Sequence, residues 1–268
     1  MQRLTAGLVF DPIGGMGTQR PVYGAILASM CWWLVPNAAF AQRYIPDCAG
    51  NPMISQTRIA HVERNGDLVL RDGRVVVLES IRLPDAPHRT EALSLLRALV
   101  LKEPLTFAVT PPQQDRYGRV RAQAFGEVWL QTALLEKGLA QTAISPDRAE
   151  CFPEMYEAEA LARKRRAGIW ADAAYQPRAP QAVKNGGGFQ LVEGRVANVG
   201  RQDGRTILSF EGQRGVSAVI AADDRRAFRD FDLEGLEARR IRIRGIIQNA
   251  RSGPQIALSN PAQIEALD

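Results

Sequence analysis

The spacing of apolar residues along the chain changes between two periods, and each period predicts a different element. Short runs that are apolar at every second residue, or apolar throughout, predict β-strands. Before residue 176 such runs lie at 58–63, 67–70, 75–81, 105–109 and 120–125. Longer runs with apolar residues every three or four positions predict helices, at 91–100, 129–137 and 153–166. This part of the chain is therefore predicted to be a strand-rich domain with three helices.

After residue 188 the pattern predicts five short strands, with one helix between the third and the fourth. The strands are FQLVEGRVANV, TILSF, SAVIA, RRIRIRGIIQ and QIALS, and the helix is DRRAFRDF. This order is that of an OB-fold, a small five-stranded barrel. The segment 176–188, QPRAPQAVKNGGG, is rich in proline and glycine and predicts a linker. The predicted domains are therefore residues 42–175 and 189–268.

The first 41 residues fit neither domain. Arg20 precedes the apolar run GAILASMCWWLV, which is followed by PNAAFAQ. A positive start, a short apolar core and small residues at a cleavage site are typical of a secretory signal. We expect a signal peptide at 1–41 that is cleaved after Ala41, a periplasmic or secreted protein, and no stable membrane insertion after cleavage. Met16 is an alternative start to Met1, and a retained membrane anchor is the alternative function of the run.

Two cysteines, Cys48 and Cys151, remain once the signal and its Cys31 are removed. An even number of cysteines in an oxidising compartment predicts a disulfide. This disulfide would close a loop of about 100 residues and stabilise the fold by up to about 4–5 kcal/mol in the chain-entropy model. Two unpaired buried thiols are the alternative.

The charge of the chain gives little support for nucleic-acid binding by itself. Residues 42–178 contain 19 Lys or Arg and 17 Asp or Glu, and residues 179–268 contain 13 and 11. Nucleic-acid-binding domains often have a clearer basic excess. Other kinds of functional site, such as a metal site or a catalytic nucleophile, have weaker support still. His61 and His88 are the only histidines, and the chain has neither the paired ligands of a zinc site nor a nucleophile elbow or phosphate-binding glycine loop.

Four segments of the first domain resemble one protein family in sequence and order. They are DGRVVVLESIRLP (72–84), DRYGR (115–119), WLQTALLEKGLAQT (129–142) and EAEALARKRRAGIW (157–170). Together they resemble the staphylococcal nuclease, or thermonuclease, family over about residues 57–171. The resemblance implies a five-stranded OB barrel with three helices. The predicted fold class is therefore mainly β with helices (α+β), with two OB-type five-stranded barrels, the first carrying three helices.

The resemblance also implies where an active site would lie. Active members hydrolyse DNA or RNA with one Ca²⁺ ion, which two aspartates hold; a glutamate assists the attacking water and two arginines neutralise the phosphate. In a gapless alignment the first metal aspartate falls on Gly66, and one deletion moves it to Asp67. The second metal aspartate falls on Arg82, the glutamate on Asp85, and the first phosphate-binding arginine on Val77.

A rival register aligns DAPH (85–88) with the DAPE of the family, and then Asp85 is a metal ligand and His88 replaces the glutamate. Arg119, in DRYGR, keeps a catalytic position, although a structural role in the turn is equally consistent with its place. An active domain would use Asp67 and Asp85 for Ca²⁺, and Asp85 and Arg119 in catalysis. One carboxylate beside Arg82 does not satisfy a cation that takes six to eight oxygens. We therefore expect no cofactor and a degenerate site.

The strand RRIRIRG (239–245) alternates arginine and isoleucine, which places Arg240, Arg242 and Arg244 on one face. With Arg119, these residues are predicted to bind nucleic acid; a solvated strand face is the alternative. The sequence thus predicts an exported, thermonuclease-like protein that binds nucleic acid or another polymer without catalysis. A Ca²⁺-dependent nuclease and a protein-interaction module are the alternatives.

Overall fold

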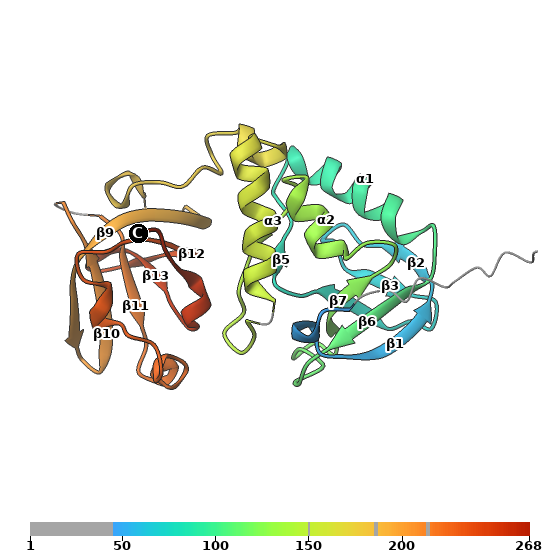
Figure 1. The fold of residues 1–268 in the computed structure, drawn as a ribbon, viewed down its shortest axis with the longest axis horizontal. Coiled ribbons are helices and arrows are strands. Elements are labelled where there is room, and N and C mark those ends of the chain that lie inside the picture. The colour runs from blue at the N-terminus through green and yellow to red at the C-terminus, as the bar shows by residue number, and fades with distance from the viewer. Residues whose placement is uncertain (1–44, 150, 185–186, 213–214) are drawn as a thin grey trace, which may run out of the picture. The chain divides into compact units, whose positions relative to one another are not determined.

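The computed structural model describes residues 45–149, 151–184, 187–212 and 215–268. The predicted signal peptide and its cleavage site lie outside the described residues. Within them the chain forms two β-barrels with three α-helices, which confirms the predicted α+β fold class (Figure 1).

The first barrel is built from six strand segments in the order β1-β6-β7-β4-β3-β2. A single residue, Arg58, separates β1 from β2, so one stretch of chain lies at both edges of the sheet and closes it. The sequence pattern predicted β2 but not β1, in which buried and exposed residues do not alternate regularly. The bounds of the strands are β1 Asn51–Thr57, β2 Ile59–Val62, β3 Leu68–Leu70, β4 Val75–Leu78, β6 Leu105–Val109 and β7 Val120–Phe125.

Three helices complete the first domain: α1 (His88–Val100), α2 (Leu130–Glu136) and α3 (Phe152–Arg165). Helix α1 buries Ala92, Leu93, Leu96 and Val100, which follow the helical period and lie on one face. A short ladder between β5 (Ile81–Arg82) and β8 (Gln141–Thr142) joins the end of the hairpin to the segment before α3. Cys48, in the 3₁₀ helix η1 (Asp47–Ala49), forms the predicted disulfide with Cys151 at the start of α3.

The second barrel has the strand connections of an OB-fold. Strands β9 and β10, β10 and β11, and β9 and β12 pair antiparallel, β11 and β13 pair parallel, and the β12–β13 pairing closes the barrel. A sixth strand, β14, extends β12 at one edge and was not predicted. The bounds are β9 Phe189–Gln202, β10 Arg205–Phe210, β11 Ser217–Ile220, β12 Arg240–Ala250, β13 Gly253–Ala257 and β14 Ile264–Ala266.

The helix that was predicted between the third and fourth strands is a 3₁₀ helix, η4 (Asp223–Phe228), which is followed by η5 (Glu234–Leu236). Its apolar residues are too few for an amphipathic α-helix, and Phe228 alone of η4 is buried. The remaining 3₁₀ helices are η2 (Gly168–Ala171), η3 (Pro180–Ala182) and η6 (Pro261–Gln263).

Part of the segment predicted as a linker packs on the second barrel. The backbone N–H of Arg178 donates to the carbonyl of Leu191, and Glu193 N–H donates to the carbonyl of Arg178, both at 2.9 Å. Pro180 is buried, and Val183 belongs to the barrel core. Among the described residues, no helix has the length and apolar character that crossing a bilayer requires.

Candidate functional site

A cavity of about 690 Å³ is lined by residues of both barrels. The first barrel contributes the β2–β3 turn, β4 and β5, the DRYGR turn and the segment after β8, and the second contributes the start of β9, the middle of β12 and the end of β13. The cavity brings together three of the predicted site residues, Asp67, Arg119 and Arg244, whereas Asp85, Arg240 and Arg242 are not among its lining. Its lining includes five arginines and three carboxylates.

Asp67 lies in the tight turn between β2 and β3 and is engaged by two neighbours. The Asn65 amide donates to Asp67 Oδ2 at 2.9 Å, and Arg119 Nη1 donates to the same oxygen at 2.8 Å. Arg119 also pairs with Asp115 at 2.7 Å. Burial raises the pKa of Asp115, but hydrogen bonds from the Arg119 backbone and side chain offset this, and the net pKa lies below the ordinary value. Arg119 is therefore held between two carboxylates.

Gly66, the position that the gapless alignment assigns to the first metal aspartate, has no room for a side chain. Its φ is +97°, a conformation that strongly favours glycine, and a Cβ there would lie 2.5 Å from Leu83 Cδ1. Leu68 and Leu70, which follow in β3, are both in the core. The turn is shaped for glycine followed by an aspartate that faces Arg119.

Asp85 is exposed at the entrance to α1 and faces two arginines. Arg82 Nη2 lies 3.2 Å and Arg89 Nη2 lies 3.3 Å from its carboxylate oxygens. His88, the residue of the rival register, lies with Nε2 at 3.3 Å from Asp172 and packs edge-on against Tyr175. In the structure, Asp85 thus pairs with Arg82 and Arg89, whereas Asp67 is held by Asn65 and Arg119.

The donor set of the cavity does not fit a calcium ion. Its three carboxylates, on Asp67, Asp115 and Glu79, each form an ion pair with an arginine. Calcium takes six to eight oxygen ligands, several of them charged. Across the described ranges, the one group of three His, Cys, Asp or Glu side chains close enough to share a metal contains Cys48 and Cys151, which are joined in the disulfide.

A second ion-pair cluster forms part of the cavity wall and was not found from sequence. Arg121 Nε donates to buried Glu79 at 2.6 Å and Nη1 donates to Asp147 at 2.8 Å, while the Ser145 hydroxyl donates to Glu79 at 2.9 Å. The hydrogen bond to Glu79 is the main reason that the pKa of Arg121 lies above its ordinary value. Arg121 is therefore an internal counterion for Glu79 and Asp147.

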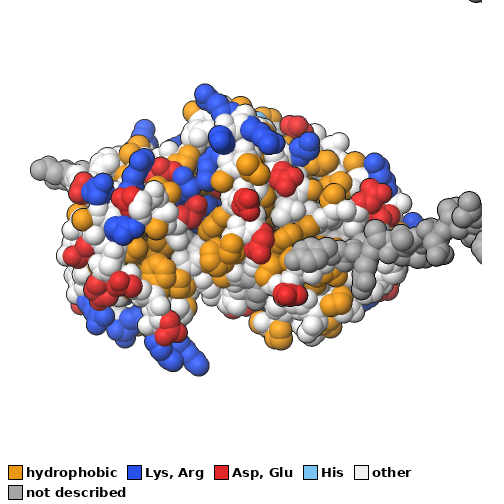
Figure 2. Space-filling model, in the orientation of Figure 1, with side chains coloured by type: hydrophobic (Ala, Val, Ile, Leu, Met, Phe, Trp, Pro, Cys, Tyr) orange, Lys and Arg blue, Asp and Glu red, His pale blue; other side chains and the backbone are white. Residues whose placement is uncertain are grey.

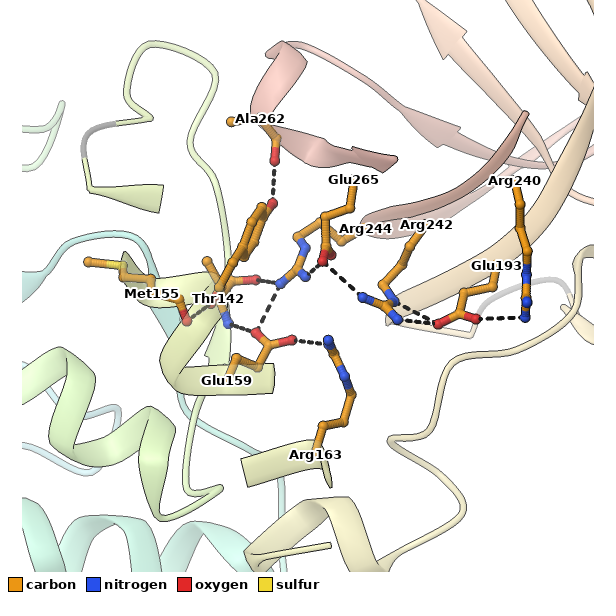
Figure 3. Close-up of polar contacts among 11 residues, drawn as sticks. Thr142, Met155, Glu159, Arg163, Glu193, Arg240, Arg242, Arg244, Ala262 and Glu265 are labelled. Carbon is orange, nitrogen blue, oxygen red and sulfur yellow. Dashed lines mark hydrogen bonds and ion pairs between the residues drawn. The ribbon is translucent and has the colours of Figure 1, made fainter. Parts of the chain in front are cut away.

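The arginine side chains of the predicted β12 stripe enter an ion-pair network between the barrels (Figure 3). Arg244, 1% exposed, donates through Nη1 to Glu159 of α3 at 2.9 Å and to the carbonyl of Thr142 at 3.0 Å. Its Nη2 pairs with Glu265 of β14. Arg242 pairs with Glu265 and Glu193 and is also largely buried. These two guanidinium groups do not form a surface that follows a phosphate backbone.

Arg240 is the one member of the predicted stripe that is exposed, and it pairs with Glu193 at 3.4 Å. The guanidinium of Arg244 also lies 4.1 Å above the ring centroid of Tyr156, whose hydroxyl donates to the carbonyl of Ala262 (Figure 3). Burial is the main reason that the pKa of Tyr156 lies above its ordinary value. The strand therefore ties α3 to the second barrel.

Three residues of the cavity region were not singled out from sequence as ligand-binding candidates. Arg82 and Arg89 line the cavity, and Tyr117, in the DRYGR turn, is exposed with Arg116 and Arg119 each 5.4 Å from its ring centroid. A signal for Arg82 was present in the sequence, because the gapless alignment places this arginine where the family has a metal-binding aspartate.

Charged side chains are mixed on the face of the molecule that Figure 2 shows. On the face shown in Figure 2, Lys and Arg lie among Asp and Glu, without an extended area of one sign. This agrees with the nearly equal numbers of basic and acidic residues in both halves of the chain. The local excess of arginine in the cavity is therefore a distinct feature of this region.

The comparisons with known proteins agree with this geometry. Residues 71–172 match the family model described as staphylococcal nuclease homologue, and no curated protein matched the chain. The matched range contains β4 to β8, all three helices and the DRYGR turn. Residues 71–172 therefore match the staphylococcal nuclease homologue family model, and a second, OB-like barrel follows them.

Proposed function

We propose that this protein binds nucleic acid in the cavity between its barrels and does not cleave it. The family match supports a nuclease-related or nucleic-acid-binding role. One observation carries the choice between these roles: every carboxylate that lines the cavity is already paired with an arginine. A cavity whose carboxylates are neutralised from within binds a metal weakly, whereas its additional arginines favour a phosphate.

Arg82 and Arg89 are the residues best placed to hold a phosphate. Their side chains are 39% and 32% exposed, and their shared partner Asp85 is 70% exposed. Ion pairs this open to water contribute about 0–1 kcal/mol, so a phosphate oxygen can replace Asp85 at low cost. A guanidinium presents several N–H donors in one plane, which matches a phosphate. Arg82 thus supplies positive charge where active relatives of this family bind calcium.

Tyr117 adds a surface suited to a base. Its ring is exposed and lies next to the guanidinium groups of Arg116 and Arg119. Exposed aromatic rings beside basic groups are typical of proteins that bind unpaired nucleic acid. The turn therefore extends the arginine surface of the cavity.

The proposal is tested by fluorescence anisotropy with a labelled oligonucleotide over a series of salt concentrations. We expect log Kd to rise with log salt concentration with a slope of about 1.4, because each of the two phosphate contacts, at Arg82 and Arg89, releases about 0.7 counterion from a single strand. The double variant R82A/R89A should lose at least tenfold in affinity. R226A is the matched control, since Arg226 is exposed on η4 and lies outside the cavity lining.

The same samples separate the proposal from its alternatives. Binding without cleavage, in calcium or in chelator, is the expected result. Cleavage that requires Ca²⁺ and is lost in R119A would establish a nuclease and contradict the proposal. Absence of binding to DNA and RNA at low salt would favour a protein-interaction module.

We also propose that the protein works in an oxidising compartment, periplasmic or extracellular. The Cys48–Cys151 disulfide supports this location. Mass spectrometry of the protein from its native host, with and without alkylation, tests the disulfide and the cleavage after Ala41 together. A free thiol at Cys48 would contradict this location.

A further inference from the structure

The second barrel contributes an apolar surface to the cavity, in contrast to the arginines of the first barrel. Ile246 of β12 and Phe189 of β9 are cross-strand partners, and both line the cavity. Ile246 is 57% exposed, which makes it the most exposed large aliphatic side chain among the described residues. A branched aliphatic side chain this open to water, inside a cavity, is a candidate for ligand contact.

The two contributions come from different parts of the chain and meet in one cavity. Arg82 and Arg89 follow β4, whereas Phe189 and Ile246 lie on the second barrel, more than 90 residues later in the sequence. Charged groups and apolar groups are thus available to one ligand at once. The ligand that fits must carry negative charge along one side and flat apolar faces along the other.

An unpaired nucleic-acid strand has these two properties. Its phosphates are accessible, and the faces of its bases are free to stack on aromatic and apolar side chains. In a double helix the base faces are stacked on one another, so that a duplex offers its phosphates but not its base faces. A cavity of about 690 Å³ also lies in the size range of sites that enclose small ligands.

We infer that Phe189 and Ile246 select unpaired strands by contacting bases, while Arg82 and Arg89 hold the neighbouring phosphates. This inference rests on the proposed function, because it names the form of nucleic acid that the same cavity takes. The second barrel then determines specificity, and the first barrel supplies most of the charge.

The network around Arg244 supports this division of roles. Arg244 precedes Ile246 by two residues on β12 and is fixed to Glu159 and Thr142 of the first domain. Ile246 is therefore attached to a segment of strand that is anchored against α3 and β8. The apolar surface is held in place beside the arginines before a ligand binds, which lowers the entropic cost of binding.

The test compares three ligands of equal length: a single strand, its duplex, and a single strand of abasic sites. The abasic strand keeps the phosphates and lacks the bases. We expect the unmodified protein to bind the single strand about tenfold more tightly than either of the other two. F189L, which keeps an apolar side chain at the packed position, and I246Q should each reduce this preference about fivefold and leave the abasic strand unaffected.

M53Q is the matched control, because Met53 is an exposed apolar residue on a strand, 51% accessible, and does not line the cavity. Equal affinity for single strand, duplex and abasic strand would overturn the inference and leave the proposed function standing. A single-strand preference that survives in both F189L and I246Q would also overturn the inference and leave the proposed function standing. Loss of binding to all three ligands in the unmodified protein would instead overturn the proposed function, and the inference with it.

Discussion

Two groups of arginines in this molecule form ion pairs with carboxylates, one group in a buried junction and the other on an exposed surface. At the barrel junction, Arg244 is enclosed between Glu159 and Glu265, and the Arg244 and Glu159 side chains are almost fully buried. At the cavity entrance, Arg82 and Arg89 face one exposed carboxylate, Asp85. A buried pair that loses one partner leaves an uncompensated charge, whereas an exposed pair is replaced by water or by another anion. Burial therefore separates the arginines that maintain structure from those that we propose to bind phosphate.

The largest expected effect is at the junction. R244M removes one of the two arginine partners of Glu159 and of Glu265, and we expect the free energy of unfolding to fall by about 3 kcal/mol, the low end of the range for breaking a buried pair, because Arg163 and Arg242 remain. The matched control is R244M/E159Q/E265Q, in which all three side chains are neutral. Urea unfolding should show that this triple variant recovers more than half of the loss. Equal losses in both variants would mean that shape, and not charge, holds the junction.

An effect of acid is expected at the same place. Burial alone would raise the pKa of Glu265, but attraction to Arg244 and Arg242 offsets this, and the pKa lies below its ordinary value of 4.5. The ion pair thus stabilises the fold above about pH 4.5, and this stabilisation is lost as pH falls through the folded-state pKa. The expected loss is about 1.4 kcal/mol for each unit of lowering. Urea unfolding between pH 3 and pH 6 measures it, and E265Q should flatten the profile.

A smaller effect is expected in alkali. The pKa of Tyr156 is raised above its ordinary value of 10.0, chiefly by burial. Its neutral form therefore contributes stability below about pH 10, and this contribution declines as pH rises toward the folded-state pKa. Y156F removes this dependence and costs about 1 kcal/mol at neutral pH, because the carbonyl of Ala262 loses its donor. Thermal unfolding at pH 7 and pH 10.5 compares the two proteins, and an unchanged alkaline slope in Y156F would assign the effect to another group.

The smallest expected effect on stability is at the cavity entrance. R82A should change the free energy of unfolding by less than about 1 kcal/mol, since its pair with Asp85 is open to solvent. Chemical denaturation of R82A and R244M under the same conditions gives the ratio of the losses in unfolding free energy at the two sites. A loss in R82A comparable to that in R244M would remove the distinction between structural and binding arginines.

The spacing of apolar residues was sufficient to predict most strands, because their apolar side chains are buried in the barrel interior. The ranges predicted for β6 and β7 coincide with those of the structure, and both strands are buried along most of their length. Strand β14 and the irregular strand β1 were missed, since neither has a regular alternation of buried and exposed residues. The strand order of the second barrel followed from the order of its elements.

The surroundings of the β12 arginines could not be predicted from the alternation of arginine and isoleucine alone. Alternating residues show which side chains share a face, but the partner of Arg244 lies 85 residues earlier in the sequence. One local signal was available: Glu159 lies among Met155, Ala158 and Ala162 on the buried face of α3. A carboxylate on a buried helix face requires cationic partners, of which Arg163 on the same helix supplies one and Arg244 the other. The metal-site substitutions, in contrast, were visible because they interrupt a recognised motif.

The contact between Glu159 and Arg244 also limits how this gene can be rearranged. A recombination event that separated the two barrels would break this ion pair and would expose to water the apolar residues that pack around the junction, such as Trp170 and Leu191. A new partner for either barrel would have to bring the complementary charge at the same position. The two barrels are therefore expected to be inherited together, as a single evolutionary unit, although each has its own core.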